Sequence, residues 1–273
     1  MLGRLGQLAR APFSPRKKHR GPRRVARRGF KGIFGRLGQL ARSPFSLTKA
    51  QRARREVARG NHLLRRGELA AAMKAFTKAI DIDDENEAAW NNRGIILETL
   101  GKPEEALKCH NRAIRLRPTY LDAWCNKGIA LMHMARLDRA QECFDTVLKV
   151  DPRHAVALVD KGVLCSRQGA HEEALELYNK ALEADPAFAL AAFNRASSLF
   201  ALGRYEESID VYNIALRRRP DLPDAWYFKG RALLESGQPK PATICLEKAI
   251  DLRPDFAEAL AALERARAEG GEG

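Results

Sequence analysis

Five prolines recur along this chain at intervals of 34 residues, and this fixed period constrains the fold more than any other feature. They are Pro118, Pro152, Pro186, Pro220 and Pro254. A period between 20 and 50 residues is typical of stacked repeats, because one such unit is too small to bury its own apolar face. The chain is therefore expected to be a stack of similar units.

Other residue types keep the same period. An aromatic residue stands 28 positions before three of the prolines, at Trp90, Trp124 and Trp226. Small residues form one column at Gly60, Gly94, Gly128, Gly162, Ala196 and Gly230. A second small column is Ala72, Ala106, Ala140, Ala174, Ser208 and Ala242, and four residues later a column of larger side chains holds Phe76, His110, Phe144, Tyr178, Tyr212 and Leu246. In the earliest copy, Asp84 takes the proline position.

These columns predict a helical hairpin in each period. Apolar residues recur at helical spacing in two blocks, and a turn separates the blocks at Gly67, Gly101, Ala135, Gly169, Gly203 and Gly237. The small residues allow two helix backbones to approach closely, and the large side chain fills the gap beside them. The residue before each proline is forced out of the α region, which ends the second helix.

This pattern resembles the tetratricopeptide repeat family, whose signature is a 34-residue helix–turn–helix. The resemblance covers six copies, at residues 53–86, 87–120, 121–154, 155–188, 189–222 and 223–256. It implies an all-α fold, a right-handed superhelical solenoid of six repeats within residues 47–273, with a capping helix at roughly 255–268. Glu56, Leu158 and Ala192 depart from the signature, because they replace the early aromatic residue.

The charges divide the chain into a basic arm and a nearly neutral remainder. Residues 1–55 hold 17 Lys and Arg and no acidic residue, whereas the remainder carries 31 basic and 34 acidic side chains. We therefore expect residues 1–46 to form a separate arm. The arm contains an internal duplication, because GRLGQLARAPFS at 3–14 returns as GRLGQLARSPFS at 35–46.

Four interpretations of the arm stay open. It is a solvated tail, an anchor to anionic lipid, a nucleic-acid-binding segment or an organelle transit peptide. Apolar residues at helical spacing favour lipid, and they are Phe30, Ile33, Phe34, Leu37 and Leu40. The runs RKKHR and RRVARR favour nucleic acid. The candidate anion-binding residues are Arg16, Lys17, Lys18, Arg20, Arg23, Arg24, Arg27, Arg28 and Lys31.

Several classes of protein are not indicated. The sequence has no apolar run of transmembrane length, no secretory signal, no phosphate-binding glycine loop and no hydrolase or metalloprotease motif. The five cysteines, Cys109, Cys125, Cys143, Cys165 and Cys245, include no CxxC pair, so we interpret them as buried or half-buried thiols in a reducing, cytoplasmic compartment. We expect no catalytic residues, no metal, no cofactor and no small-molecule substrate.

The family resemblance implies a peptide-binding groove lined by the first helix of each repeat. The positions two before the first small column hold Asn92, Asn126, Asp160, Asn194 and Phe228, which resemble the asparagine ladder in the repeats of O-linked N-acetylglucosamine transferase. An amide side chain both donates and accepts, so such a row can pair with any extended backbone. The adjacent positions, Asn91, Cys125, Val159, Phe193 and Tyr227, become more apolar and aromatic toward the C-terminus and predict an anchor there.

Two further features of the sequence bear on which partner the groove could bind. The carboxylate clamp of chaperone-binding members requires cations where this chain has Val57, Asp122 and Asn126, so binding to chaperone tails is not expected. A basic column stands just before the first small column, at Arg59, Arg93, Lys127, Lys161, Arg195 and Lys229. Its aliphatic stems either pack while the charges reach water and neighbouring carboxylates, or the charges form a ribbon for an acidic partner.

We therefore predict a non-catalytic scaffold or adaptor that binds a polypeptide in its groove and uses the basic arm for tethering. The alternative is a protein associated with nucleic acid or anionic membrane that acts mainly through the arm.

Overall fold

The computed structural model describes residues 47–271 of the chain, and every regular element in this range is an α-helix. Two compact units are distinguished, the first ending at Arg93 and the second beginning at Gly94. The arm residues predicted to bind anions lie outside the described residues; they are Arg16, Lys17, Lys18, Arg20, Arg23, Arg24, Arg27, Arg28 and Lys31.

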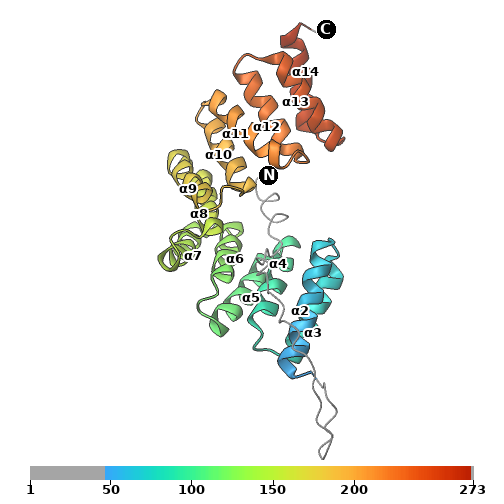
Figure 1. The fold of residues 1–273 in the computed structure, drawn as a ribbon, viewed down its shortest axis with the longest axis vertical. Helices are drawn as coiled ribbons and strands as arrows, with labels where there is room; N and C mark the ends of the chain where they lie inside the picture. The colour runs from blue at the N-terminus through green and yellow to red at the C-terminus, as the bar shows by residue number, and fades with distance from the viewer. Residues whose placement is uncertain (1–46, 272–273) are drawn as a thin grey trace, which may run out of the picture. The chain divides into compact units, whose positions relative to one another are not determined.

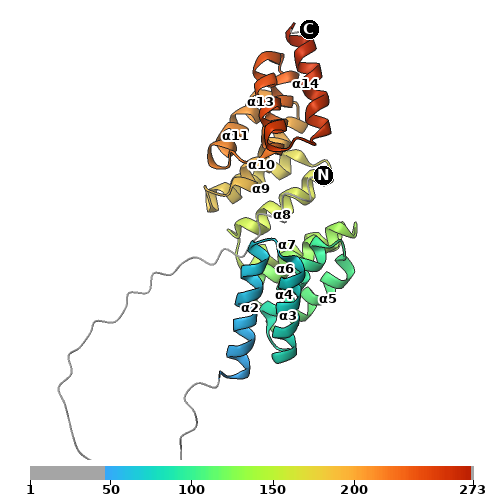
Figure 2. The ribbon, with the colours of Figure 1, turned by 90° about the vertical axis from the view of Figure 1, so that its right-hand side faces the viewer.

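The first unit contains α2 (Lys49–Arg65), α3 (Leu69–Ile82) and the beginning of α4 (Glu87–Thr99). Helix α2 starts at a capping box, in which Thr48 Oγ1 accepts from the Gln51 N–H and Gln51 Oε1 accepts from the Thr48 N–H. Helices α2 and α3 lie side by side (Figure 2), because α2 buries Ala53 and Val57 on the face that meets α3.

The second unit holds the remainder of α4 and the helices that follow. In chain order they are α5 (Pro103–Leu116), α6 (Leu121–His133), α7 (Leu137–Val150), α8 (Ala155–Arg167), α9 (His171–Ala184), α10 (Ala189–Ala201), α11 (Tyr205–Arg218), α12 (Pro223–Glu235), α13 (Pro239–Leu252) and α14 (Ala257–Gly270). Each helix contacts the next one along the chain, so neighbours in sequence are neighbours in this unit (Figure 1). In addition, the first helices of successive hairpins, α6, α8, α10, α12 and α14, contact one another in that order.

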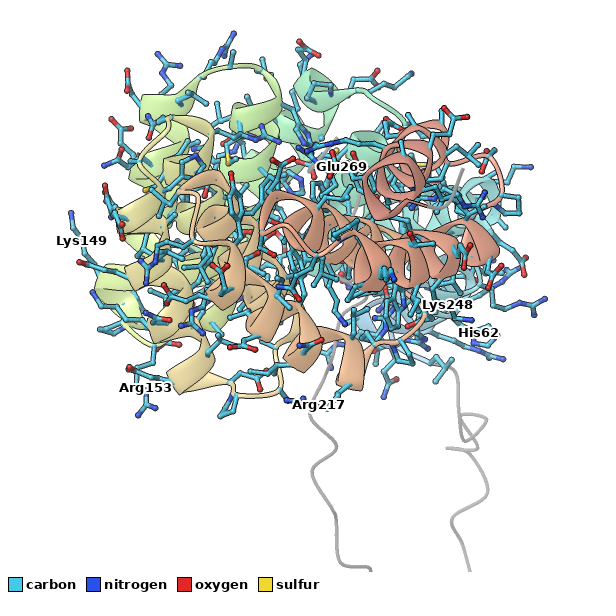
Figure 3. All side chains as sticks on the ribbon, turned by 90° about the horizontal axis from the view of Figure 1, so that it is seen from above. His62, Lys149, Arg153, Arg217, Lys248 and Glu269 are labelled. Atoms are coloured by element: carbon cyan, nitrogen blue, oxygen red, sulfur yellow. The ribbon has the colours of Figure 1, made fainter. Side chains whose placement is uncertain are left out.

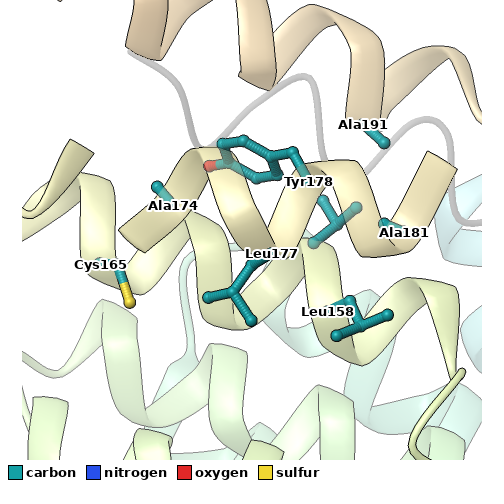
Figure 4. Packing of buried hydrophobic residues seen from close by; sticks show 8 residues of the cluster. Leu158, Cys165, Ala174, Leu177, Tyr178, Ala181 and Ala191 are labelled. Carbon is teal, nitrogen blue, oxygen red and sulfur yellow. The ribbon is translucent and has the colours of Figure 1, made fainter. Parts of the chain in front are cut away.

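The predicted pairing of a small residue with a large side chain is confirmed in both units. A Cβ built at Gly128 would lie 2.4 Å from the Phe144 ring, and one built at Gly162 would lie 2.5 Å from the Tyr178 ring. The glycine therefore sets the approach of the two helices in a hairpin. Figure 4 shows the surrounding core, where the Tyr178 ring packs among side chains of α8, α9 and Ala191 of α10.

The predicted end of each second helix is also observed. Arg117 and Asp151, which precede prolines, have extended φ/ψ values of −140°/93° and −133°/93°. Asp83 adopts the same conformation at −148°/94°, although Asp84 rather than proline follows it. The geometry of this turn therefore does not depend on the proline alone.

The tryptophan column fastens this turn to the next helix. The indole N–H of Trp124 donates to the carbonyl oxygen of Pro118 at 3.0 Å, and Trp226 bonds to Pro220 in the same way at 2.9 Å. Trp90 donates to the carbonyl of Asp84 at 2.8 Å. A tryptophan here thus combines an apolar ring with a donor that satisfies a loop carbonyl.

The turns inside the hairpins share a left-handed residue. Five of them use glycine, for example Gly101 with φ 72°, whereas the turn between α6 and α7 uses Ala135 with φ 56°. The Arg136 N–H then donates to the Leu131 carbonyl at 2.9 Å, as the Lys102 N–H does to Leu97. This is the Schellman pattern of helix termination, for which glycine is the usual residue.

Candidate peptide-binding site

The predicted groove residues of the second unit occupy equivalent places on α6, α8, α10 and α12, which are the helices that contact one another. Their polar members are nearly buried, with relative exposures of 7% for Asn126, 4% for Asp160 and 9% for Asn194. Val159 and Phe193 are exposed by only 1% and 3%. The asparagine ladder stays a prediction, and these side chains line the base of the helix layer rather than project from it.

The two predicted groove residues of the first unit belong to a small amide network. Asn92 Nδ2 donates to Asn61 Oδ1 at 2.7 Å, and Asn91 Nδ2 donates to Asn92 Oδ1 at 3.4 Å. Both Asn91 and Asn92 are buried. Their amides therefore already take part in hydrogen bonds that join α2 to α4.

The predicted aromatic anchors are brought together at the C-terminal end of the second unit. The ring centroid of Phe228 lies 6.0 Å from that of Phe193 and 5.0 Å from that of Tyr227, in edge and tilted arrangements. Tyr227 and Phe228 are half-buried, whereas Phe193 beneath them is buried. Two half-exposed rings on a buried aromatic base form a rigid apolar surface.

The structure adds two aromatic residues that sequence reasoning did not assign to this site. Tyr212 stacks on Phe228 at 6.5 Å with an interplanar angle of 9°, and Phe256 lies 4.8 Å from Tyr227. The sequence pattern predicts Tyr212 only as part of the large-residue column of the hairpins, and it gives Phe256 no role. We call the set Phe193, Tyr212, Tyr227, Phe228 and Phe256 the aromatic cluster.

Two arginines border the aromatic cluster. The guanidinium carbon of Arg231 lies 5.8 Å from the Tyr227 ring centroid and 4.8 Å from that of Phe200. Arg253 lies over Phe256 at 4.4 Å and donates to both carboxylate oxygens of Asp224. The spacing of Arg231 four residues after Tyr227 is the sequence signal that could have indicated this contact. Half-buried rings with an adjacent guanidinium can hold an apolar side chain together with a carbonyl or carboxylate.

Buried hydroxyls form hydrogen bonds within two of the hairpins, α8–α9 and α10–α11. Tyr212 shares a hydrogen bond with Ser197 at 3.0 Å, and Tyr178 shares one with Ser166 at 3.2 Å. Burial raises the pKa of both tyrosines well above the ordinary value of 10.0. These phenols therefore stay neutral and serve as fixed polar contacts within the helix layer.

The basic column makes contacts within the protein. Lys127 and Lys229 lie over the rings of Trp124 and Trp226, at 4.9 and 5.4 Å. Lys161 Nζ is 2.8 Å from Asp145 Oδ1. Arg93 lies 5.8 Å from the Trp90 ring, and Arg59 lies 3.6 Å from Glu56. These contacts support the interpretation that the stems pack and the charges reach neighbouring side chains.

All five cysteines fall within residues 47–271 and are buried thiols that no disulfide joins. Within the same range no cluster of three His, Cys, Asp or Glu side chains could hold a metal ion. None of the helices in it is both long enough and apolar enough to cross a membrane.

Comparison with solved structures supports the fold. The chain superposes on the APC/C hetero-tetramer Cut9–Hcn1 with a TM-score of 0.74 and 19% identity, covering 79% of this chain and 43% of that one. It superposes on PilW, a widely conserved type IV pilus biogenesis factor, with a TM-score of 0.68 and 20% identity, covering 77% and 98%. For YrrB, a TPR protein with an unusual peptide-binding site, the TM-score is 0.51 and the identity 23%, with 70% and 99% covered. No curated protein matches the sequence significantly.

Family models for the tetratricopeptide repeat match residues 87–120, 125–189 and 193–255, which together make up more than half of the chain. Proteins of this family typically mediate protein–protein interactions and scaffolding. The repeat period, the paired helices and these matches agree, and the predicted family and all-α helical-repeat fold are confirmed. The chain belongs to the tetratricopeptide repeat family.

Proposed function

We propose that this protein is a non-catalytic scaffold that holds a segment of a partner polypeptide against the first helices of its second unit. The observation that carries the proposal is the aromatic cluster. Tyr227 and Phe228 present half-exposed rings, and the buried rings of Phe193, Tyr212 and Phe256 fix their orientation. Rigid aromatic residues in a well-packed surface are the usual hot spots of protein interfaces.

The surroundings of the cluster define the partner segment in chemical terms. An apolar side chain would pack on Tyr227 and Phe228, and Arg231 would donate to a backbone carbonyl or acidic side chain beside it. YrrB, which shares the fold, is a TPR protein with an unusual peptide-binding site. That likeness agrees with a peptide-binding role here.

The experiment uses peptides selected on the full chain from a random linear peptide library displayed on phage. The variant Tyr227→Ala/Phe228→Ala should bind the selected peptides about 30-fold more weakly by calorimetry, since losing a hot spot costs about 2 kcal/mol. Tyr120→Ala is the control, because Tyr120 is a half-buried aromatic outside the cluster. Circular dichroism checks that each variant stays folded. Equal affinity for the double variant and the wild type would reject the anchor.

The arm gives the scaffold a second proposed role. Residues 1–46 carry thirteen Lys and Arg and no acidic residue. Such a segment is drawn to polyanions by charge alone. We assign it to tethering, so that the second unit binds a polypeptide while the arm holds the protein at a nucleic acid or an anionic membrane.

A further inference from the structure

Helix α2 and its C-cap residue carry a row of basic side chains along the solvent-facing side, four arginines and one histidine. Arg52, Arg55, Arg59, His62 and Arg66 follow one another at intervals of three and four residues and are all exposed. At about 100° per residue these positions fall within about 80° of one another on the helix, and they extend over about 21 Å. We call these five residues the α2 basic stripe. Figure 3 labels His62, a member of the stripe.

The stripe lies on the side of α2 that packing leaves open. Ala53, Val57 and Gly60 are the buried positions of α2, and the Phe76 ring of α3 covers Gly60. The stripe occupies the opposite side of the helix, as its exposure shows. The packing against α3 and the capping box at Thr48 fix the orientation of α2, so the basic side chains of the stripe lie in one line.

Carboxylates within the first unit neutralise only part of this charge. Residues 47–93 hold ten Lys and Arg and seven acidic residues, but α2 itself carries six Lys and Arg and a single acidic residue, Glu56. Glu56 accepts from Lys78 at 2.7 Å, and Glu68 accepts from Arg66 at 2.7 Å. In the described residues, no ion pair involves Arg52, Arg54, Arg55 or Arg65.

The second unit differs, because its charges are mixed. Residues 94–273 contain 25 basic and 27 acidic side chains. Exposed cations such as Lys149, Arg153 and Arg217 do point away from its helices (Figure 3), but they are interspersed with carboxylates. The excess positive charge of the folded chain is therefore concentrated on α2, which directly follows the basic arm.

Arg52 also opposes the stability of its own helix. It lies at the end of the first turn of α2, where the helix dipole presents partial positive charge, and that turn has no acidic residue. A cation in this place destabilises the helix, whereas the first turns of α5, α9 and α11 each hold two glutamates. An external anion that binds here would offset this unfavourable charge.

We infer that the α2 basic stripe binds the phosphate backbone of a nucleic-acid duplex. Arginine supplies most of the stripe, and its planar guanidinium forms paired hydrogen bonds with phosphate oxygens. The stripe contains no Phe, Tyr or Trp on which unpaired bases would stack, which favours a duplex over a single strand.

The same residues disfavour insertion into a lipid surface. A helix that binds in a membrane interface needs an exposed apolar face beside its cations. Ala53 and Val57 of α2 are buried and Leu63 and Leu64 are half-buried, so the exposed positions of the helix hold only alanine or polar side chains. A duplex backbone requires no apolar contact.

The test measures binding of the full chain to a fluorescein-labelled 24-base-pair DNA duplex of arbitrary sequence at several salt concentrations. The variant Arg52→Gln/Arg55→Gln/Arg59→Gln removes three charges and keeps helix propensity nearly constant. The slope of log affinity against log salt should decrease in magnitude by about 3, one for each lost phosphate contact. An RNA duplex of the same sequence shows which nucleic acid binds more tightly.

The control variant is Lys108→Gln/Arg139→Gln/Lys180→Gln, which removes three exposed cations from the second unit. Its salt slope should match that of the wild type, although its net charge equals that of the stripe variant. Equal slopes for the two variants would overturn the proposal, since general charge and the arm would then account for binding. Binding to vesicles of phosphatidylserine and phosphatidylcholine, without binding to either duplex, would also overturn it.

This proposal does not rest on the peptide site. Tyr227→Ala/Phe228→Ala should keep the wild-type salt slope, and the stripe variant should bind the selected peptides with unchanged affinity. Each proposal can therefore fail without the other.

Discussion

At the scale of single residues, one missing Cβ sets the separation of two helices. Gly128 lies directly beneath the Phe144 ring, with no room for a methyl group between them. The same contact recurs with tyrosine at Gly162, with histidine at Gly94 and with leucine at Gly230. The large residue differs from hairpin to hairpin, but the residue that packs against it is glycine in each of these cases. Helix propensity alone would disfavour glycine at these positions.

We expect Gly128→Ala to destabilise the protein by about 1–3 kcal/mol, because the added methyl group forces the Phe144 ring out of its position. In a Phe144→Ala background the sign should reverse, since alanine is then favoured over glycine by about 1 kcal/mol of helix propensity. Urea denaturation of the four proteins measures both effects. A destabilisation of equal size in both backgrounds would show that the ring is not responsible.

At Ala135, in a turn, we expect the opposite preference, because glycine should be more stable there than alanine. Its φ of 56° lies in the left-handed region, which costs a non-glycine residue about 1–2 kcal/mol. Ala135→Gly should therefore stabilise the protein by about 0.5–1 kcal/mol, after allowing for the greater flexibility of glycine in the unfolded chain. The thermal midpoint of unfolding measures this effect. Ala170→Gly is the control and should not stabilise the protein, because Ala170 lies one residue after the left-handed glycine of the next hairpin turn. A lower midpoint for Ala135→Gly would contradict the strain.

At the scale of elements, each helix is stable only because its neighbours cover its apolar face. Helix α14 illustrates this at the end of the second unit, where Leu263 and Ala266 pack against Leu233, Leu234 and Leu246. Its outward face carries Glu258, Glu264 and Arg265, and Arg265 pairs with Glu235 and Glu269 at 2.8 and 2.7 Å. A polar outer face on the last helix is what a terminal unit of a repeat stack requires. The capping role of residues 255–268 stays a prediction.

Two leucines of α14 test whether it acts as a cap. Leu263→Ala should cost about 2–3 kcal/mol, because it leaves a cavity over α12 and α13. Leu260→Ala should cost less than about 0.5 kcal/mol, since Leu260 is 43% exposed on the same helix. Calorimetric melting of both variants gives the comparison. Equal midpoints for the two would show that α14 does not stabilise the helices beneath it.

At the scale of the whole molecule, pH links the buried thiols to stability. Burial raises the pKa of Cys143 and Cys165 from 9.0 to about 11. Between these values the unfolded chain releases protons that the folded chain keeps, so the folded state binds more protons. Stability is therefore unaffected by these groups below pH 9 and decreases as the pH rises from 9 toward 11. The buried phenols of Tyr178 and Tyr212 act in the same direction.

We expect the urea midpoint to decrease steadily from pH 8.5 to pH 10.5. The variant Cys143→Ala/Cys165→Ala should show a shallower decrease over this interval. The remaining slope is due to the tyrosines and to Cys245, whose pKa burial also raises. A thiol reagent at pH 8 should modify the native protein slowly and the urea-unfolded protein rapidly, because the native thiols are buried. An unchanged pH slope in the double variant would show that these thiols do not couple to folding.

The sequence by itself determined the repeat. Its 34-residue period, the pairing of Gly128 with Phe144 and the extended residue before Pro118 follow from local sterics and helix periodicity, which each hairpin repeats. That Phe193, Tyr227 and Phe228 lie close together could be predicted from the same register, because equivalent positions of stacked hairpins must be neighbours. How far each side chain is exposed is visible only in the three-dimensional structure, since burial depends on the packing of neighbouring hairpins. There, Val159 and Asn126 are nearly covered, Tyr212 and Phe256 lie against Phe228 and Tyr227, and four arginines and His62 form one row on the side of α2 that packing leaves open.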